Sequence, residues 1–396
     1  MSRQYYEFFC PVKVIAGKAA IEHIPYELTS IGAKRPMIVT DKGVRAAGLL
    51  DPVIAACEDS GLEIVSIFDD VPPDSSISVV RTIAALYRKE KCDSIIAVGG
   101  GSAIDTGKAV NILVSEGGDD LAKYSGAGVI KKPLNPFFVV PTTAGTGSEV
   151  TSVAVITDEV KGVKLPFTSS FLLPNAAIID PRMTITLPPH ITAATGMDAM
   201  THSVEAYTCM AKNPLSDAYA TAAIKKISQF LPKVMDNPKD VDGRLELAQA
   251  STMAGIAFSN SMVGLVHALG HATGAICHLP HGLCMSLYLP YVLEYNLETI
   301  RQPLGELLLY LDGPEVYSAT PASRRAEASI AALRKMRNTL YQQCQLPRTL
   351  KESGKVTYDQ LEAIARMALD DGAIMFNPKE ADLKDVRAVL ENAWAG

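Results

Sequence analysis

The sequence predicts two domains, an α/β domain over residues 1–184 followed by an all-helical domain over residues 185–396. Short, continuously apolar segments alternate with helical patterns over the first 180 residues, which is typical of a parallel sheet covered on both faces by helices. After the Pro188–Pro189 pair, long helical patterns rich in Ala, Leu and Met follow with hardly a strand-like segment between them. A length of 396 residues also favours two domains over one.

The expected strands are short apolar segments bounded by turn residues. They cover residues 37–40, 63–68, 94–98, 137–140 and 176–180. Helical patterns cover residues 79–89 in the first domain, and residues 244–274 and 357–369 in the second. Ligands of open α/β sheets bind at the carboxyl ends of the strands, so the loops that follow these strands are candidate sites.

Composition indicates an ordinary globular protein with small-molecule partners. Charged residues make up 20% of the chain and hydrophobic residues 48%, which excludes disordered and collagen-like classes. The formal net charge of −6 does not favour nucleic acid or an anionic membrane surface. Without a signal-peptide pattern or a run of about 18 apolar residues, we expect a cytoplasmic protein with no membrane partner. The seven cysteines are scattered and predict no disulfide framework.

Two loops after expected strands are candidates for binding phosphate groups. Gly99–Ser102 follows one strand and opens a helical pattern, where backbone N–H groups and the helix dipole hold anions. Its spacing fits neither GxGxxG nor GxxxxGK, so a glycine turn needed only for packing is the alternative. The second loop, residues 141–149, offers hydroxyl groups and glycines. Two such loops in one sheet predict a Rossmann-like crevice for a dinucleotide.

Asp41 directly follows the first expected strand. Its carboxylate could accept hydrogen bonds from a ribose and repel a 2′-phosphate, or it could only stabilise a turn. The residues alone leave both roles open.

Histidines cluster in the second half of the chain. Four of the seven lie within fifteen residues, namely His267, His271, His278 and His281. Asp198 and His202 are four residues apart on a helical pattern, as are His267 and His271, so each pair points from one helix face and can share an ion. A carboxylate with imidazoles favours Fe²⁺, Zn²⁺ or Mn²⁺ over Ca²⁺ or Mg²⁺. Spacing alone does not separate His271 from His281 as a ligand.

Together these segments resemble the iron-containing, or group III, alcohol dehydrogenases over essentially the whole chain. Residues 180–205 and 264–284 carry the strongest resemblance, and the two glycine-containing loops occur in the family's order. The resemblance implies a dehydroquinate synthase-like architecture, with a Rossmann-like dinucleotide-binding domain before a helical metal-binding domain. It also implies an NAD-dependent oxidoreductase that interconverts small primary alcohols or diols and aldehydes, with Fe²⁺ as the expected metal and Zn²⁺ or Mn²⁺ as alternatives.

The resemblance also assigns roles to residues. It implies a set of four metal ligands, which are Asp198, His202, His267 and His281, and it places His271 beside the nicotinamide as a catalytic non-ligand. The implied cofactor-binding residues are Asp41, Gly99, Gly100, Gly101, Ser102, Thr142, Thr143, Lys164 and His271. An aspartate at position 41 is associated with NAD over NADP. The implied substrate-pocket residues are Val153, Phe258 and Ala373.

Two other functions fit parts of the pattern. A metal- and NAD-dependent lyase of the dehydroquinate synthase-like type must hold a polyanionic substrate, but residues 198–202 and 264–281 contain no Lys or Arg. A non-catalytic metal-binding protein would have no use for the two phosphate-type loops. We therefore predict a dehydrogenase that acts on a small alcohol or aldehyde by hydride transfer, assembled as a homodimer or higher homo-oligomer.

Overall fold

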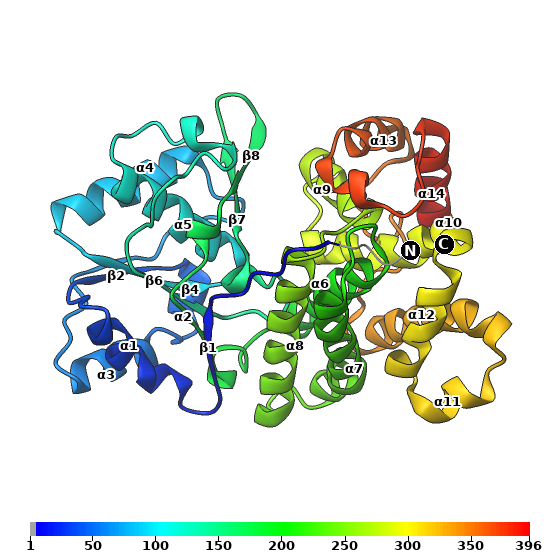
Figure 1. Ribbon diagram of the computed structural model, residues 1–396, viewed down its shortest axis with the longest axis horizontal. Coiled ribbons are helices and arrows are strands. Elements are labelled where there is room, and N and C mark those ends of the chain that lie inside the picture. Colours follow the sequence, from blue (N-terminus) through cyan, green and yellow to red (C-terminus); the bar gives the residue numbers. More distant parts are fainter. Residues whose placement is uncertain (1–4) are drawn as a thin grey trace. The chain divides into compact units, whose positions relative to one another are not determined.

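The computed structural model describes residues 5–396 and divides into two compact units, each outlined in Figure 1. The α/β unit comprises Cys10–Thr186, and the helical unit comprises Leu187–Gly396 together with residues 5–9. Residues 5–9 join the helical unit because the Phe9 N–H donates to Asn260 Oδ1 and the Phe8 ring stacks on Tyr219. The predicted fold class, a Rossmann-like α/β half followed by a helical half, is confirmed.

The α/β unit is built on a six-stranded parallel sheet with the order β1-β9-β6-β4-β2-β3. Its strands are β1 (Lys13–Ala16), β2 (Pro36–Val39), β3 (Ser66–Phe68), β4 (Ser94–Gly99), β6 (Phe137–Pro141) and β9 (Ala176–Ile179). Five of the six coincide with expected strands. Strand β1 was missed because it lies at the sheet edge with Lys13 and Val14 exposed, so it has no continuous apolar signal.

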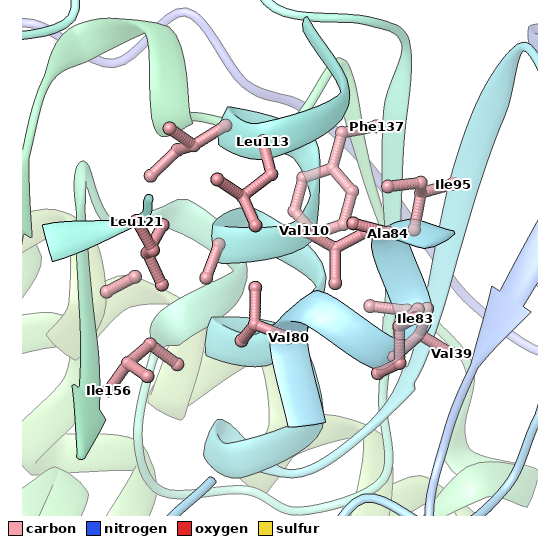
Figure 2. Packing of buried hydrophobic residues seen from close by; sticks show 14 of the residues in the cluster. Val39, Val80, Ile83, Ala84, Ile95, Val110, Leu113, Leu121, Phe137 and Ile156 are labelled. Atoms are coloured by element: carbon pink, nitrogen blue, oxygen red, sulfur yellow. The ribbon is translucent and has the colours of Figure 1, made fainter. Parts of the chain in front are cut away.

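Alternate residues of the central strands pack on opposite faces of the sheet. Ile95 of β4 packs in one core with α4 (Ile77–Lys89) and α5 (Gly101–Glu116), as Figure 2 shows. Ile96 packs in the other core with α1 (Ile24–Ser30) and α3 (Asp51–Asp59). Burial of both faces explains why these strands have continuous apolar sequences.

A second, three-stranded sheet has the order β5-β8-β7. It contains β5 (Gly126–Ala127), β7 (Val153–Asp158) and β8 (Val163–Thr168), with β7 and β8 antiparallel. These strands were not predicted, because β5 has only two residues and β8 is largely exposed and contains Pro166. Strand β7, in contrast, begins with four apolar residues that could have indicated it. The remaining helix of this unit is α2 (Lys42–Ala46).

The helical unit begins with α6 (Pro189–Thr208). It continues with α7 (Pro214–Asp236), α8 (Val241–Ser259), α9 (Leu265–Cys277), α10 (His281–Leu311), α11 (Gly313–Ala319), α12 (Arg325–Cys344), α13 (Leu361–Leu369) and α14 (Leu383–Ala395). The single helical pattern expected over residues 244–274 is wrong, since the helix breaks between α8 and α9. Met262 lies in the break with a positive φ of 78°, which no helix tolerates in its interior.

Two further expectations from the sequence concern cysteine pairing and membrane-spanning helices. All seven cysteines are unpaired, and Cys10, Cys92 and Cys344 are only partly buried. A search of residues 5–396 finds no helix with the length and apolar character needed to cross a membrane.

Candidate active site

Helix α6 presents Asp198, His202 and Glu205 at intervals of four and three residues, so the three side chains share one face. All three are buried. Glycine at position 196 lets this helix pack closely on α7, since a Cβ atom there would lie 2.7 Å from Leu231 Cδ1. The close contact fixes the segment that carries the candidate ligands.

The start of α10 brings His281 to the same place. A Cβ atom on Gly282 would lie 2.6 Å from the Ala194 carbonyl oxygen, so only glycine allows α10 to begin this close to α6. As a result, His281 Nε2 lies 3.4 Å from Asp198 Oδ1.

Helix α9 contributes the fourth residue of the cluster, His267, whose ring centroid lies 4.6 Å from that of His202. One ligand atom from each of Asp198, His202, His267 and His281 lies within 4.8 Å of the others. The structure therefore brings together the four residues that the resemblance implied as ligands.

The chemistry of this cluster fits a divalent cation. His202 Nδ1 and His267 Nε2 are buried and have no hydrogen-bond partner among residues 5–396, and buried Asp198 Oδ1 has only His281 Nε2 nearby, at 3.4 Å and without a well-formed hydrogen bond. Buried polar atoms without a partner are costly, and a bound cation would satisfy all three. Burial lowers the pKa of His202 to about 3 and the pKa of His267 well below its usual value. Both imidazoles are then neutral, which is the form that binds a metal.

His271 lies outside the four-residue cluster, although it is one turn from His267 on α9. Its Nδ1 lies 2.9 Å from Asp371 Oδ2, and its side chain is 48% exposed. Its ring is nearly parallel to that of His281, with 5.5 Å between the centroids. The geometry thus separates His271 from His281, which spacing could not do.

Two of the substrate-pocket candidates lie close to this cluster. The Phe258 ring stacks on His202 with 4.3 Å between the centroids. The Ala373 N–H donates to Asp371 Oδ1, the carboxylate that also contacts His271. Val153 is the first residue of β7 in the α/β unit.

In the α/β unit, the candidate cofactor residues other than Lys164 lie at the ends of three neighbouring strands of the parallel sheet, β2, β4 and β6. Asp41 follows β2 and caps α2, with Oδ1 accepting from the Val44 N–H at 2.9 Å. Asp41 Oδ2 faces the glycine loop, since a Cβ atom on Gly99 would lie 3.5 Å from it. Asp41 therefore has its turn-stabilising role and also lies beside the candidate crevice.

The two candidate loops contact each other at the ends of β4 and β6. The Thr142 N–H donates to the Gly99 carbonyl oxygen at 3.0 Å. A Cβ atom on Gly100 would lie 3.2 Å from Thr143 Cγ2. Helix α5 begins at Gly101, immediately before Ser102, so its N-terminus opens at this sheet edge. A phosphate group is stabilised at such a position.

Lys108 is wholly buried and binds the backbone at the end of the second loop and just after it. Its Nζ donates to the carbonyl oxygens of Ser148, Thr151 and Val153, each at 2.8 Å. One turn earlier on α5, Asp105 accepts from the Ser148 Oγ at 2.6 Å. Burial lowers the pKa of Lys108 to about 8. Lys108 thus orders the loop and does not reach toward a phosphate.

Lys164, on β8, forms an ion pair with Asp74, with 2.5 Å between Nζ and Oδ1. Both side chains are exposed, so the pair is weak in water. The structure describes no contact of Lys164 with the glycine loop.

Comparison with known proteins decides the family. The family model described as iron-containing alcohol dehydrogenase matches residues 11–181, and the model for the C-terminal part of the Fe-containing alcohol dehydrogenase family matches residues 192–394. This chain belongs to the iron-containing alcohol dehydrogenase family.

Named relatives match this alcohol dehydrogenase over its full length. It is 35% identical to the NAD-dependent methanol dehydrogenase of Bacillus methanolicus, over 98% of this chain and 99% of that protein. It is also 35% identical to the 1,3-propanediol dehydrogenase of Klebsiella pneumoniae over 100% of both chains. The crystal structure of a 1,3-propanediol oxidoreductase matches with a TM-score of 0.94 and 34% identity, covering 99% of this chain and 100% of that one. The predicted family and enzyme class are confirmed, and this oxidoreductase interconverts alcohols and aldehydes.

Three functional candidates of this alcohol dehydrogenase were missed from the sequence: Glu205, Asp371 and Lys108. Glu205 follows His202 by three residues, so helical spacing could have placed it on the ligand face. Asp371 lies 100 residues from His271, and no local pattern connects the two.

Proposed function

We propose that this alcohol dehydrogenase uses NAD and one divalent cation to interconvert a small primary alcohol or diol and its aldehyde. The cluster of Asp198, His202, His267 and His281, with its unpartnered buried atoms, carries the proposal. Relatives named as a methanol dehydrogenase and a 1,3-propanediol dehydrogenase support the size of the substrate.

The four clustered residues would hold the cation. When bound, the cation supplies Lewis acidity toward a substrate oxygen. Three neutral imidazoles and one carboxylate neutralise only one of its two charges, which preserves that acidity. Fe²⁺ is the expected ion, given the family and the mixed oxygen and nitrogen ligands, with Zn²⁺ and Mn²⁺ as alternatives.

His271 would act on the proton of the alcohol. Its ring is half exposed beside the cluster, and Asp371 fixes its orientation through Nδ1. A ring held in this way can pass a proton between the substrate hydroxyl and solvent. Phe258 and Ala373 would line the substrate pocket around it, and Val153 stays a candidate that only the resemblance supports.

NAD would bind at the ends of β2, β4 and β6. Gly99, Gly100, Gly101 and Ser102 would face the pyrophosphate at the N-terminus of α5, and Thr142 and Thr143 would contact the cofactor from the neighbouring loop. Asp41 would accept hydrogen bonds from a ribose. Lys164 would contact the nicotinamide ribose, as the resemblance implies. A cytoplasmic location and a homo-oligomeric state stay predictions.

Metal reconstitution tests the proposal. The metal-free protein is loaded under anaerobic conditions with Fe²⁺, Zn²⁺ or Mn²⁺, and oxidation of NADH is followed with a panel of short aldehydes. At least one metal should restore turnover in proportion to its stoichiometry, up to one ion per chain. Turnover that is equal in the metal-free and loaded proteins would contradict the proposal.

A further inference from the structure

A buried carboxylate lies behind the candidate metal cluster and contacts one of its imidazoles. Glu205 Oε2 lies 2.5 Å from His267 Nδ1. The other ring nitrogen, Nε2, is one of the buried atoms without a partner among residues 5–396. We propose that Glu205 is a positioning residue that holds the proton of His267 on Nδ1 and so makes Nε2 the metal ligand. This inference rests on the proposed metal-dependent function.

The assignment follows from the donors and acceptors of the two groups. A neutral imidazole carries one proton, and an ionised carboxylate only accepts hydrogen bonds. The hydrogen between Glu205 and His267 must then belong to Nδ1, which leaves the lone pair on Nε2. Histidines that bind metals commonly donate their other N–H to a carboxylate, which fixes the ring orientation.

The second oxygen of Glu205 is also held. Oε1 accepts from the Val266 N–H at 2.8 Å. A backbone N–H donor at Oε1 favours the ionised carboxylate, which only accepts hydrogen bonds.

Glu205 also closes the N-terminus of α9, the helix that carries His267. The first N–H groups of a helix have no partner within the helix, and Val266 is the second residue of α9. Its N-cap, Gly264, has no side chain to accept from them, and a Cβ atom there would lie 3.2 Å from Glu205 Oε1. One carboxylate from α6 thus caps α9 and orients the ligand that α9 contributes.

A neighbouring amide fixes the same helix end independently of His267. Asn377 Oδ1 accepts from the Leu265 N–H at 3.3 Å. Asn377 and Asn296 also donate to each other, with both distances 2.9 Å. Because these contacts remain when Glu205 changes, the start of α9 has a second support.

Glu205→Gln separates positioning of His267 from capping of α9. The glutamine oxygen can still accept from the Val266 N–H, which turns the NH₂ group toward His267 Nδ1. Nδ1 must then accept, so the proton moves to Nε2 and the ligand lone pair is lost. We expect the dissociation constant for Zn²⁺, measured by competition with a chelator, to rise by about 10- to 100-fold. The melting temperature of the metal-free protein should change little.

Asp371→Asn is the matched control. It alters the same type of histidine–carboxylate pair, and the histidine, His271, is on the same helix α9 but lies outside the cluster. Its Zn²⁺ affinity should equal that of the wild type. Equal affinity in Glu205→Gln and wild type, or equal loss in both variants, would overturn the role of Glu205.

The protonation of His267 gives a second test that needs no substitution. The ¹⁵N chemical shifts of His267 in the metal-free wild type should show a proton on Nδ1 and none on Nε2. A proton on Nε2 would overturn the inference. A wild-type protein that binds none of Fe²⁺, Zn²⁺ or Mn²⁺ would instead overturn the proposed function.

Discussion

The two units of this alcohol dehydrogenase build their candidate sites by different means. In the helical unit, ligand-type side chains from α6, α9 and α10 converge within 4.8 Å, and those from α6 and α9 are buried. In the α/β unit, backbone groups, glycines and small hydroxyl side chains meet at the ends of neighbouring strands. Loss of one side chain should therefore abolish metal binding, whereas most changes in the crevice should only shift cofactor affinity or selectivity.

Removal of one cluster histidine should have the largest effect. His281→Ala is expected to abolish stoichiometric metal binding and turnover together, since His281 is one of four candidate ligands. Its side chain is 40% exposed, so little packing is lost. Metal content by elemental analysis, with circular dichroism as a check of folding, measures the outcome. His278→Asn, at an exposed position with a left-handed backbone that Asn tolerates, is the control. Full metal content in His281→Ala would remove His281 from the ligand set.

Lys108→Met tests whether a single side chain can also matter in the α/β unit. The substitution leaves three carbonyl oxygens, two of them in buried hydrogen bonds, without this donor and Asp105 without its nearby cation. The free energy of unfolding should fall by about 3 kcal/mol, and NAD should bind more weakly because the loop is released. Denaturant unfolding and NAD titration measure the two effects, and metal content should stay normal.

Lys161→Met is the matched control for Lys108→Met, because Lys161 lies in the same unit with a side chain that is 67% exposed. It should change the free energy of unfolding by less than about 1 kcal/mol. If both variants have the same free energy of unfolding, the buried contacts of Lys108 do not stabilise the loop.

The difference between local patterns and contacts made by packing explains which features could be predicted from the sequence. Strands such as β4 were predictable because both faces are buried, which gives a continuous apolar segment after Ser94. Asp198 and His202 were predictable because helical spacing places them on one face. The place of His281 in the cluster followed from the resemblance and not from spacing, since it depends on the contact of Gly282 with the Ala194 carbonyl oxygen, which only the packing of α10 on α6 creates.

Buried charged residues were the main omission. Sequence spacing assigned no role to Lys108 or Glu205, because their burial and partners are set by elements distant in the chain. Lys108 meets residues 40 to 45 positions away, and Glu205 meets His267 at a separation of 62. Such partners become visible only once the fold is known.

His271→Ala separates proton transfer from metal binding within the helical unit. Metal content should stay near that of the wild type, because His271 lies outside the four-residue cluster. Turnover should fall by about 100-fold, the usual contribution of a general acid or base, and the pH–rate profile should change shape. Steady-state kinetics over a range of pH, together with metal analysis, measures this. Loss of metal in His271→Ala would show that the α9 pair at positions 267 and 271 is the ligand pair.

Cofactor selectivity should show the smallest effect, because it depends on one carboxylate at the edge of the crevice. Asp41 can accept hydrogen bonds from ribose hydroxyls, whereas the 2′-phosphate of NADP would bring about two negative charges toward a third. At roughly 4 Å and an effective dielectric near 20, the Coulomb term is about 4 kcal/mol per charge pair, and solvent and salt reduce it considerably. A residual of about 1.4 kcal/mol still gives tenfold preference for NAD.

Two substitutions at Asp41 distinguish repulsion from hydrogen bonding. Asp41→Gly removes both, and it also removes the bond to the Val44 N–H that caps α2, at a cost of only a few tenths of a kcal/mol. Asp41→Asn keeps an acceptor for the cap and for the ribose but removes the charge. If repulsion dominates, both variants should gain about tenfold in kcat/KM with NADPH, and the gain should shrink as ionic strength rises. Metal content should stay unchanged, since Asp41 belongs to the α/β unit. If the wild type uses NADPH as efficiently as NADH, Asp41 is only the cap of α2.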